Sequence, residues 1–174
     1  TRRKNLLLRD LDELVNQQLS KMLFANPQRI DYYDRYQEII DAYNAEQNRA
    51  TIEKTFMDLM ELASSLDTEQ QRYVREGFSS DEELSVYDLL FSENLTKQEI
   101  ETIKKVSVDL LTKIKQQIAK LDHWTDKQET KAIVDNLIRK TLWQELPNSY
   151  DVSDIQTYQK KIYEYVYMRY PEVA

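Results

Sequence analysis

Gly77 is the only glycine in this chain of 174 residues, which also has only three prolines. Hairpins, bulges and phosphate-binding loops need residues that tolerate left-handed or sharply turned backbone, and glycine supplies most of them. The sequence therefore predicts an all-α fold. Gly77 itself is predicted to end one helix at the C′ position, with Ser79 or Ser80 capping the next helix.

Apolar residues recur at three- and four-residue spacing along most of the chain, which is typical of amphipathic helices. Helices are predicted over residues 5–24, 27–47, 51–66, 67–76, 80–91, 97–121, 125–145 and 153–170. The first is expected to bury a stripe made of Leu7, Leu11, Leu14, Val15, Gln18, Leu19 and Met22. The third is expected to bury Ile52, Phe56, Leu59, Ala63 and Leu66. The sequence thus predicts an irregular bundle of about seven to eight helices.

Capping signals indicate where several of these helices begin. Asn26 precedes a proline, an arrangement favoured at helix starts. Thr96 and Glu99 have the spacing of a capping box, and Asp67 with Gln70 has a similar pattern. We therefore expect helix starts after Asn26, Asp67 and Thr96.

Charge is distributed unevenly between the two halves of the chain, whose net charge is -7. Residues 1–95 contain 11 basic and 19 acidic side chains (-8), whereas residues 96–174 contain 13 and 12 (+1). This shift predicts an acidic helical subdomain (1–95) and a C-terminal helical subdomain (96–174). The two meet near Asn94–Thr96, either as packed subdomains or as one continuous domain. The acidic excess argues against a general nucleic-acid binder, because phosphate contacts need Lys and Arg.

The chain has no cysteine, which excludes disulfides, thiolate metal sites and cysteine nucleophiles. This composition fits a reducing, cytoplasmic setting. No apolar run is long enough to span a bilayer, so no membrane partner is expected. Because the chain begins with Thr1, not Met, we expect it to be a fragment of a longer protein.

Few residues suggest chemistry. The acidic residues Asp81, Glu82 and Glu83 fit a favourable interaction with a helix N-terminus better than a metal site. His123 is the only histidine and has no paired ligand at metal-binding spacing. Glu129 and Lys131 have the Glu-x-Lys spacing of many nucleases, but those sites lie on strands, and this tripeptide lies in a predicted helix. The sequence therefore lacks the metal ligands that a free-standing helical enzyme with a carboxylate metal site would need.

Two surfaces are candidates for binding. In the last helix, Tyr163, Tyr167 and Tyr170 form a stripe apart from the main apolar side. This stripe either packs on the N-terminal half of the chain or contacts another protein, where tyrosine is enriched. The helix over residues 97–121 carries six lysines that either form a solvated face or contact phosphate: Lys97, Lys104, Lys105, Lys113, Lys115 and Lys120.

Four blocks of sequence, in the same order, resemble a known family. They are NPQRIDYYDRYQEIIDAYN (residues 26–44), REGFSSDEELSVYDLL (75–90), LTKQE (95–99), and residues 124–151, in which Leu146-Pro147 is followed by Tyr150-Asp151. From about Leu6 to Tyr170 the chain is similar to the C-terminal helical region of the R (restriction and translocation) subunit of type I restriction-modification enzymes.

The resemblance implies a role as part of a larger enzyme. In that family the R subunit is an endonuclease and a DNA translocase that uses ATP and Mg²⁺, with a nuclease domain and two motor domains ahead of its helical region. It works bound to a methyltransferase core of modification and specificity subunits. We therefore expect this chain to be non-catalytic and to hold no cofactor. We expect it to help dock the R subunit onto that core, through the modification subunit, and to help position the motor domains relative to bound DNA. DNA would then be contacted indirectly or weakly. The alternative is direct contact with duplex DNA through the lysines of residues 97–121.

Overall fold

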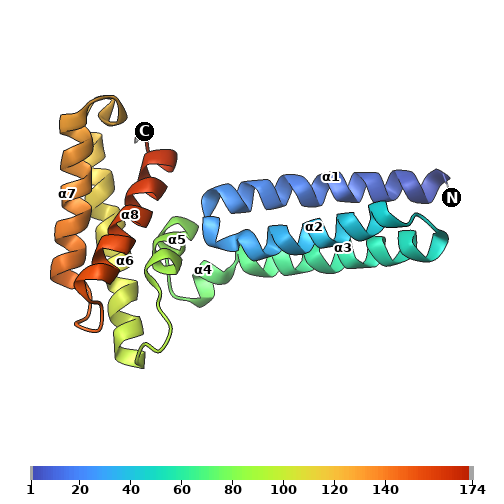
Figure 1. The fold of residues 1–174 in the computed structure, drawn as a ribbon, viewed down its shortest axis with the longest axis horizontal. Helices are drawn as coiled ribbons and strands as arrows, with labels where there is room; N and C mark the ends of the chain where they lie inside the picture. Colours follow the sequence, from blue (N-terminus) through green and yellow to red (C-terminus); the bar gives the residue numbers. More distant parts are fainter. Residues whose placement is uncertain (1, 173–174) are drawn as a thin grey trace. The chain divides into compact units, whose positions relative to one another are not determined.

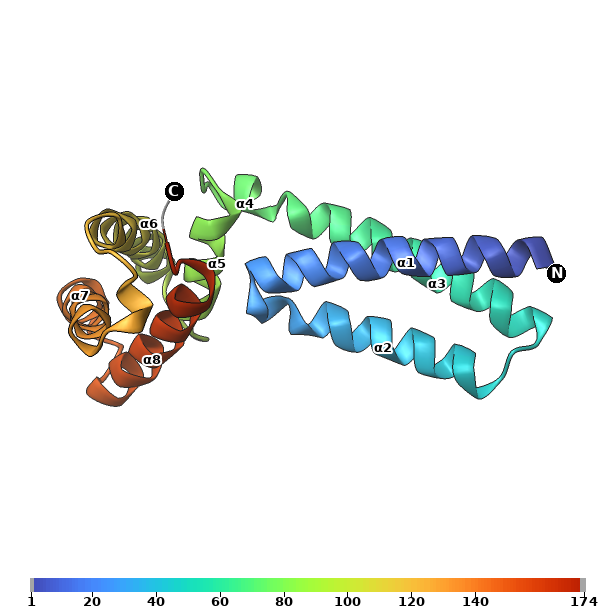
Figure 2. The same ribbon diagram turned by 90° about the horizontal axis from the view of Figure 1, so that it is seen from above.

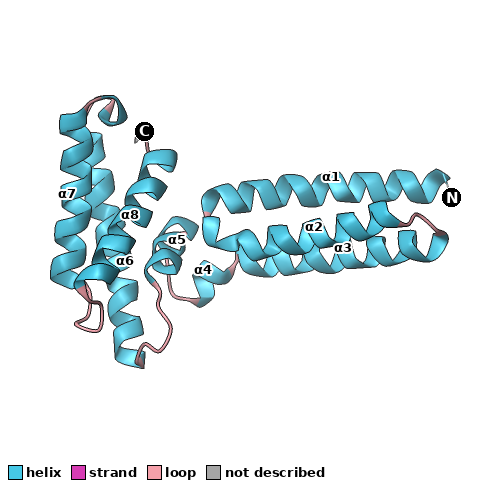
Figure 3. Cartoon of the chain, in the orientation of Figure 1, coloured by secondary structure: helices cyan, strands magenta, loops and turns pink. Residues whose placement is uncertain are grey.

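The computed structural model describes residues 2–172, and all regular structure in this range is helical (Figure 3). It contains eight α-helices and two short 3₁₀ helices, which confirms the predicted all-α class and the number of helices. Contacts within the chain divide it into two compact units between Asp81 and Glu82. They are called the first unit and the second unit below.

The first unit is built from three long helices that lie side by side (Figures 1 and 2). Its elements are α1 (Arg2–Ala25), the 3₁₀ helix η1 (Pro27–Arg29), α2 (Ile30–Ala45), α3 (Arg49–Gln70) and the short α4 (Arg72–Arg75). Helices α1 and α3 run in the same direction and α2 runs in the opposite one (Figure 1). The core of this unit consists of Leu8, Val15, Leu19, Met22, Tyr36, Leu59, Leu62 and Leu66.

The predicted apolar stripe of the first helix is partly wrong. Leu7 and Leu14, which were expected in the core, are 52% and 64% exposed, whereas Leu8 is buried. Phe56 of α3 was also expected in the core and is exposed. The reason is that α1 packs on both α2 and α3, so its buried line runs through Leu8 and Val15 and leaves one side of the helix open.

Local helix signals were mostly predicted correctly. The side chain of Asn26 accepts a hydrogen bond from the Gln28 amide at 3.1 Å, and Thr96 forms a reciprocal capping box with Glu99. Gly77 has φ +86°, and the Gly77 and Phe78 amides donate to the carbonyls of Val74 and Tyr73, which makes a Schellman motif.

The predicted helix start at Asp67 is wrong. Helix α3 continues through Asp67 to Gln70, because Leu66 and Glu69 extend its buried face by another turn. The carboxylate of Asp67 does not cap a helix; it accepts a hydrogen bond from Gln18 Nε2 at 3.0 Å. The next short helix, α4, begins only at Arg72.

The second unit contains helices that alternate in direction (Figure 1). Its elements are α5 (Asp81–Leu90, of which Asp81 belongs to the first unit), α6 (Lys97–Ala119), the 3₁₀ helix η2 (Trp124–Asp126), α7 (Gln128–Glu145) and α8 (Val152–Arg169). Helix α7 packs against both α6 and α8. Helix α5 is buried on almost every side, at Leu84, Ser85, Val86, Tyr87, Leu89 and Leu90.

The boundary between the units lies ahead of the predicted seam near Asn94–Thr96. Helix α5 belongs with the helices that follow it, because Lys115 and Tyr170 bind Glu82, and the Tyr150 hydroxyl donates to the Leu90 carbonyl at 2.5 Å. The predicted acidic subdomain of residues 1–95 therefore extends past the first unit. The seam was predicted from the net charge of each half of the sequence, and net charge carries no information about contacts between residues far apart in the chain.

Candidate interaction surfaces

Tyr163 and Tyr167 on α8 pack around a buried tryptophan of the second unit. The rings of both tyrosines meet Trp124 edge-on, with centroids 6.1 and 5.8 Å from it, and lie 6.1 Å from each other. Trp124 has no exposed surface, and burial raises the pKa of Tyr163. The two tyrosines thus cover η2, while Tyr167 keeps an exposed side next to the exposed Met168.

Tyr170 faces a different group of residues. Its carbonyl accepts a hydrogen bond from Trp124 Nε1 at 2.7 Å, and its hydroxyl donates to Glu82 Oε2 at 2.8 Å. Lys115 Nζ is 2.5 Å from the same oxygen and 5.4 Å from the centre of the Tyr170 ring. Burial alone would raise the pKa of Glu82, but the hydrogen bonds from Lys115 and Tyr170 hold it below its usual value. All three tyrosines of the predicted stripe therefore contact Trp124, and the Tyr170 side chain in addition binds Glu82.

The lysines of α6 do not form a row of free cations. Lys113 lies 2.9 Å from Asp109 and 3.1 Å from Glu145, and these hydrogen bonds raise its pKa. Lys115 is bound to Glu82, and Lys104 lies 5.9 Å over the ring of Tyr87. The other three, Lys97, Lys105 and Lys120, are exposed.

A buried ion network in the first unit was not predicted from the sequence. Arg29 is only 3% exposed, and its Nε lies 3.3 Å from Glu69 Oε2. Its two terminal nitrogens bind the Asp81 carboxylate at 3.0 and 2.6 Å, and one of them also donates to the Met22 carbonyl at 3.2 Å. Arg72 Nε shares Glu69, at 2.6 Å. Asp81 therefore binds Arg29 in addition to opening helix α5, and no local pattern links two residues 52 positions apart.

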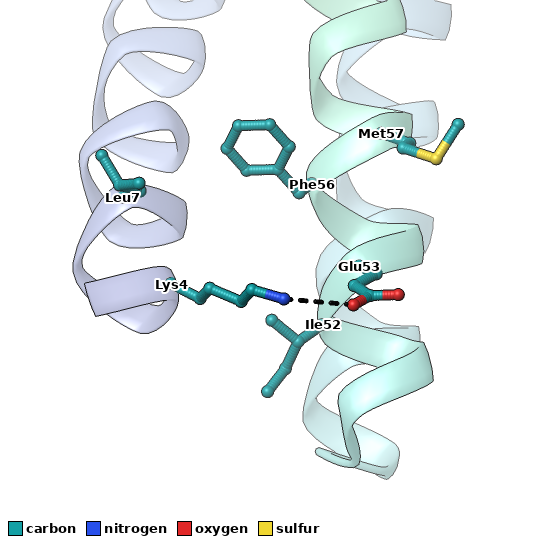
Figure 4. Close-up of a pocket in the computed structure, with 6 residues that line it drawn as sticks. All are labelled: Lys4, Leu7, Ile52, Glu53, Phe56 and Met57. Atoms are coloured by element: carbon teal, nitrogen blue, oxygen red, sulfur yellow. Dashed lines mark hydrogen bonds and ion pairs between the residues drawn. The ribbon is translucent and has the colours of Figure 1, made fainter. Parts of the chain in front are cut away.

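One hydrophobic surface that is left open in the first unit lies between α1 and α3. A hollow of about 370 Å³ there is lined by Lys4, Leu7, Ile52, Glu53, Phe56 and Met57, and is called the α1–α3 groove below (Figure 4). The Phe56 ring projects from α3 toward α1, where Leu7 lies at about the same level, while Met57 lies on the outer side of α3 (Figure 4). Lys4 Nζ closes one end with an ion pair to Glu53 at 3.2 Å.

The same surface continues along both helices. Leu14 on α1 and Met60 on α3 are exposed beyond the hollow. The hydrogen bond between Gln18 and Asp67 then joins the two helices again. Sequence reasoning missed this surface because it assigned Leu7, Leu14 and Phe56 to the core.

The residues considered from the sequence as metal ligands or catalytic groups do not lie together in one site. His123 has a left-handed backbone (φ 48°), and its ring nitrogens lie 3.4 Å from Asp122 and 3.3 Å from Glu172. Glu129 and Lys131 lie at the start of α7 and, two residues apart on a helix, point to different sides. Within residues 2–172 there is no group of three or more His, Cys, Asp or Glu side chains that could hold a metal ion. None of the helices in this range is both long and apolar enough to cross a bilayer.

Comparison with known families gives a match over nearly the whole chain. The model of the family described as "Type I restriction enzyme HindI endonuclease subunit-like, C-terminal" matches residues 1–170. Comparison with curated proteins and with solved structures gave no significant match.

Proposed function

The chain belongs to the family of C-terminal domains of type I restriction enzyme HindI endonuclease subunit-like proteins, and from this premise we propose that it is an assembly domain. In this proposal it docks the endonuclease (R) subunit onto the methyltransferase core formed by the modification and specificity subunits, and it holds the motor domains of its own subunit in place. The chain itself is non-catalytic. The ATP- and Mg²⁺-dependent steps belong to other parts of the subunit.

The observation that carries this proposal is the apolar surface of α1 and α3. Leu7, Leu14, Phe56, Met57 and Met60 are all exposed on two neighbouring helices. An exposed apolar patch of this size is often functional, and sites of protein interaction are one such function. Tyr167 and Met168 on α8 offer a second, smaller apolar contact.

Direct binding of duplex DNA by α6 is a weaker alternative. Lys113 and Lys115 already bind carboxylates, so a phosphate would have to compete with Asp109, Glu145 and Glu82. If the remaining lysines did bind DNA, the affinity would fall steeply as salt increased.

The proposal is tested by deleting this domain, residues 1–170 in the numbering used here, from the full-length endonuclease subunit. Intact and deleted subunits are each mixed with the methyltransferase core and analysed by gel filtration with light scattering. ATP hydrolysis at high DNA concentration serves as the control that the deleted subunit is folded. Co-elution of only the intact subunit is the expected result. If both forms co-elute equally with the core, the docking role is refuted.

A further inference from the structure

Helices α1 and α3 run in parallel with a constant register. Lys4 pairs with Glu53 and Gln18 with Asp67, and in both pairs the partners are 49 residues apart. Because the two helices advance together, residues at the same offset lie at the same level of the two helices, as Leu7 and Phe56 do (Figure 4). Between the Lys4/Glu53 and Gln18/Asp67 pairs, this register places three further pairs of residues at matching levels of the two helices. The five successive layers are Lys4/Glu53, Leu7/Phe56, Leu11/Met60, Leu14/Ala63 and Gln18/Asp67.

These layers are spaced by three and four residues, as in a coiled coil. The three middle layers are apolar and the two outer ones are polar. Side chains of a further helix can insert between such layers as knobs into holes. The polar layers are 14 residues apart on each helix, or about 21 Å at 1.5 Å per residue, which is the length of about four helical turns.

The exposed area distinguishes between possible occupants. Leu7, Leu14, Phe56, Met57 and Met60 together expose on the order of 500 Å², taking about 200 Å² for a fully exposed large apolar side chain. A stable protein interface buries about 800 Å² on each partner. Pairing two copies through this surface alone falls short of that area. A single helix, bound as one element of a larger interface, fits the groove in both length and area.

Charge at one end of the groove sets the direction of that helix. Lys4 and Arg49 share one carboxylate, Glu53, each at 3.2 Å, so these three side chains together carry a net positive charge. Helix α3 begins at this end and has no acidic residue in its first turn to offset its positive N-terminus. A second hollow of about 510 Å³, which Lys4, Arg49 and Ile52 help to line, adjoins the first. This end is complementary to the negative C-terminus of a helix and to carboxylate side chains.

We propose that the α1–α3 groove binds an amphipathic helix of about four turns from the methyltransferase core, antiparallel to α1 and α3. This inference rests on the docking role proposed above and specifies its contact. The apolar face of the bound helix covers Leu7, Leu14, Phe56 and Met60. Acidic residues at its C-terminal end lie against Lys4 and Arg49.

Substitutions on the groove test the apolar contact. In the full-length endonuclease subunit, the double variant Leu14→Glu, Met60→Glu is expected to weaken binding to the purified core by about 30-fold or more, the size of an interface hot spot. Both side chains are exposed, so circular dichroism and the melting temperature should be unchanged. The matched control is Trp143→Glu, at an exposed apolar residue of α7, which should bind like the wild type.

Charge reversal tests the orientation. The variant Lys4→Glu, Arg49→Glu is expected to weaken binding at low salt, and the difference from wild type should shrink at high salt, because exposed charges are screened. Arg9→Glu is the matched control, since Arg9 lies on another side of α1 and pairs with Glu13. If both variants lose the same affinity, the basic end of the groove does not direct the partner.

A photoreactive side chain at Met57, which is 71% exposed, identifies the occupant in the assembled enzyme. A crosslink to the modification or the specificity subunit supports the proposal. A crosslink within the endonuclease subunit, or between two copies of it, overturns it. If deletion of residues 1–170 abolishes assembly but the groove variants bind like wild type, the groove assignment is wrong and the docking role stands. If the deletion has no effect, both fail.

Discussion

Replacing Arg29 with methionine tests whether the buried ion network stabilises the first unit. Arg29 is almost completely buried, and its guanidinium binds Glu69 at 3.3 Å and Asp81 at 2.6 Å. It also donates to the carbonyl of Met22. Methionine keeps an apolar stem of similar length and removes every one of these hydrogen bonds.

The expected cost follows from what remains after the substitution. Removing one member of a buried ion pair costs about 3–5 kcal/mol, because the other charge is left without a partner. Here Arg72 still binds Glu69 at 2.6 Å, so that carboxylate keeps a cation. Asp81 is 31% exposed and regains water. We therefore expect a loss at the low end of the range, about 3 kcal/mol.

Urea unfolding followed by circular dichroism measures this loss, provided that the slope of the transition is unchanged. Arg35→Met is the matched control, because Arg35 is 44% exposed and lies 3.9 Å from Glu61. A surface pair of this kind contributes less than about 1 kcal/mol. If Arg29→Met destabilises the chain no more than Arg35→Met does, the stabilising role of the buried ion network in the first unit is refuted.

Three further predictions concern the packing and the electrostatics of the chain. Trp124→Ala should cost about 3–5 kcal/mol in unfolding free energy. It should also remove the buried part of the tryptophan fluorescence, and unchanged emission would contradict the burial of Trp124. The pKa of Glu82 is lower in the folded chain than in the unfolded chain. The ionised carboxylate therefore stabilises the fold fully at pH values above the pKa of the unfolded state, and this stabilisation is lost as the pH falls through the pKa of the folded state. The difference in melting temperature between wild type and Glu82→Gln should therefore shrink below about pH 4, and a constant difference would refute the role of Glu82. Gly77→Ala should cost about 1–2 kcal/mol in unfolding free energy, because φ is +86° at this position. An added Cβ would meet no atom within 4 Å, so a loss measured by urea unfolding reports backbone strain alone.

Helix ends were predicted well where they depend on neighbouring residues only. The capping box of Thr96 and Glu99 and the left-handed turn at Gly77 use partners within five positions along the chain. Asp67 has a similar local pattern, yet its carboxylate binds Gln18 of another helix, and α3 continues past it. Local signals thus fail where a distant residue competes for the same side chain.

The buried face of α1 could be predicted only approximately. The three- and four-residue spacing identified an amphipathic helix but admitted Leu7 and Leu14 alongside Val15 and Leu19. Which of these are covered depends on where α2 and α3 lie, and that is not encoded in the periodicity of one helix. For this reason the α1–α3 groove could not be found from the sequence.

The contacts of the candidate surfaces were also beyond local reasoning. Tyr170 was proposed from the sequence as a candidate interface residue, and nothing in the sequence indicated its partner Glu82, which is 88 positions away. Arg29 gave no signal, because its partners Glu69 and Asp81 fit ordinary helical positions and lie 40 and 52 positions away. Pairings of this kind are created by the packing of the helices.

The dissociation constant between the endonuclease subunit and the methyltransferase core tests the assembly role most directly. It is measured without DNA, at low and at high salt, for the full-length subunit and for the subunit lacking this domain (residues 1–170 in the numbering used here). The proposed role predicts that binding weakens by about 100-fold or more when this domain is removed, since a handful of anchor residues carry most of the energy of an interface. Equal dissociation constants for the two forms would contradict it.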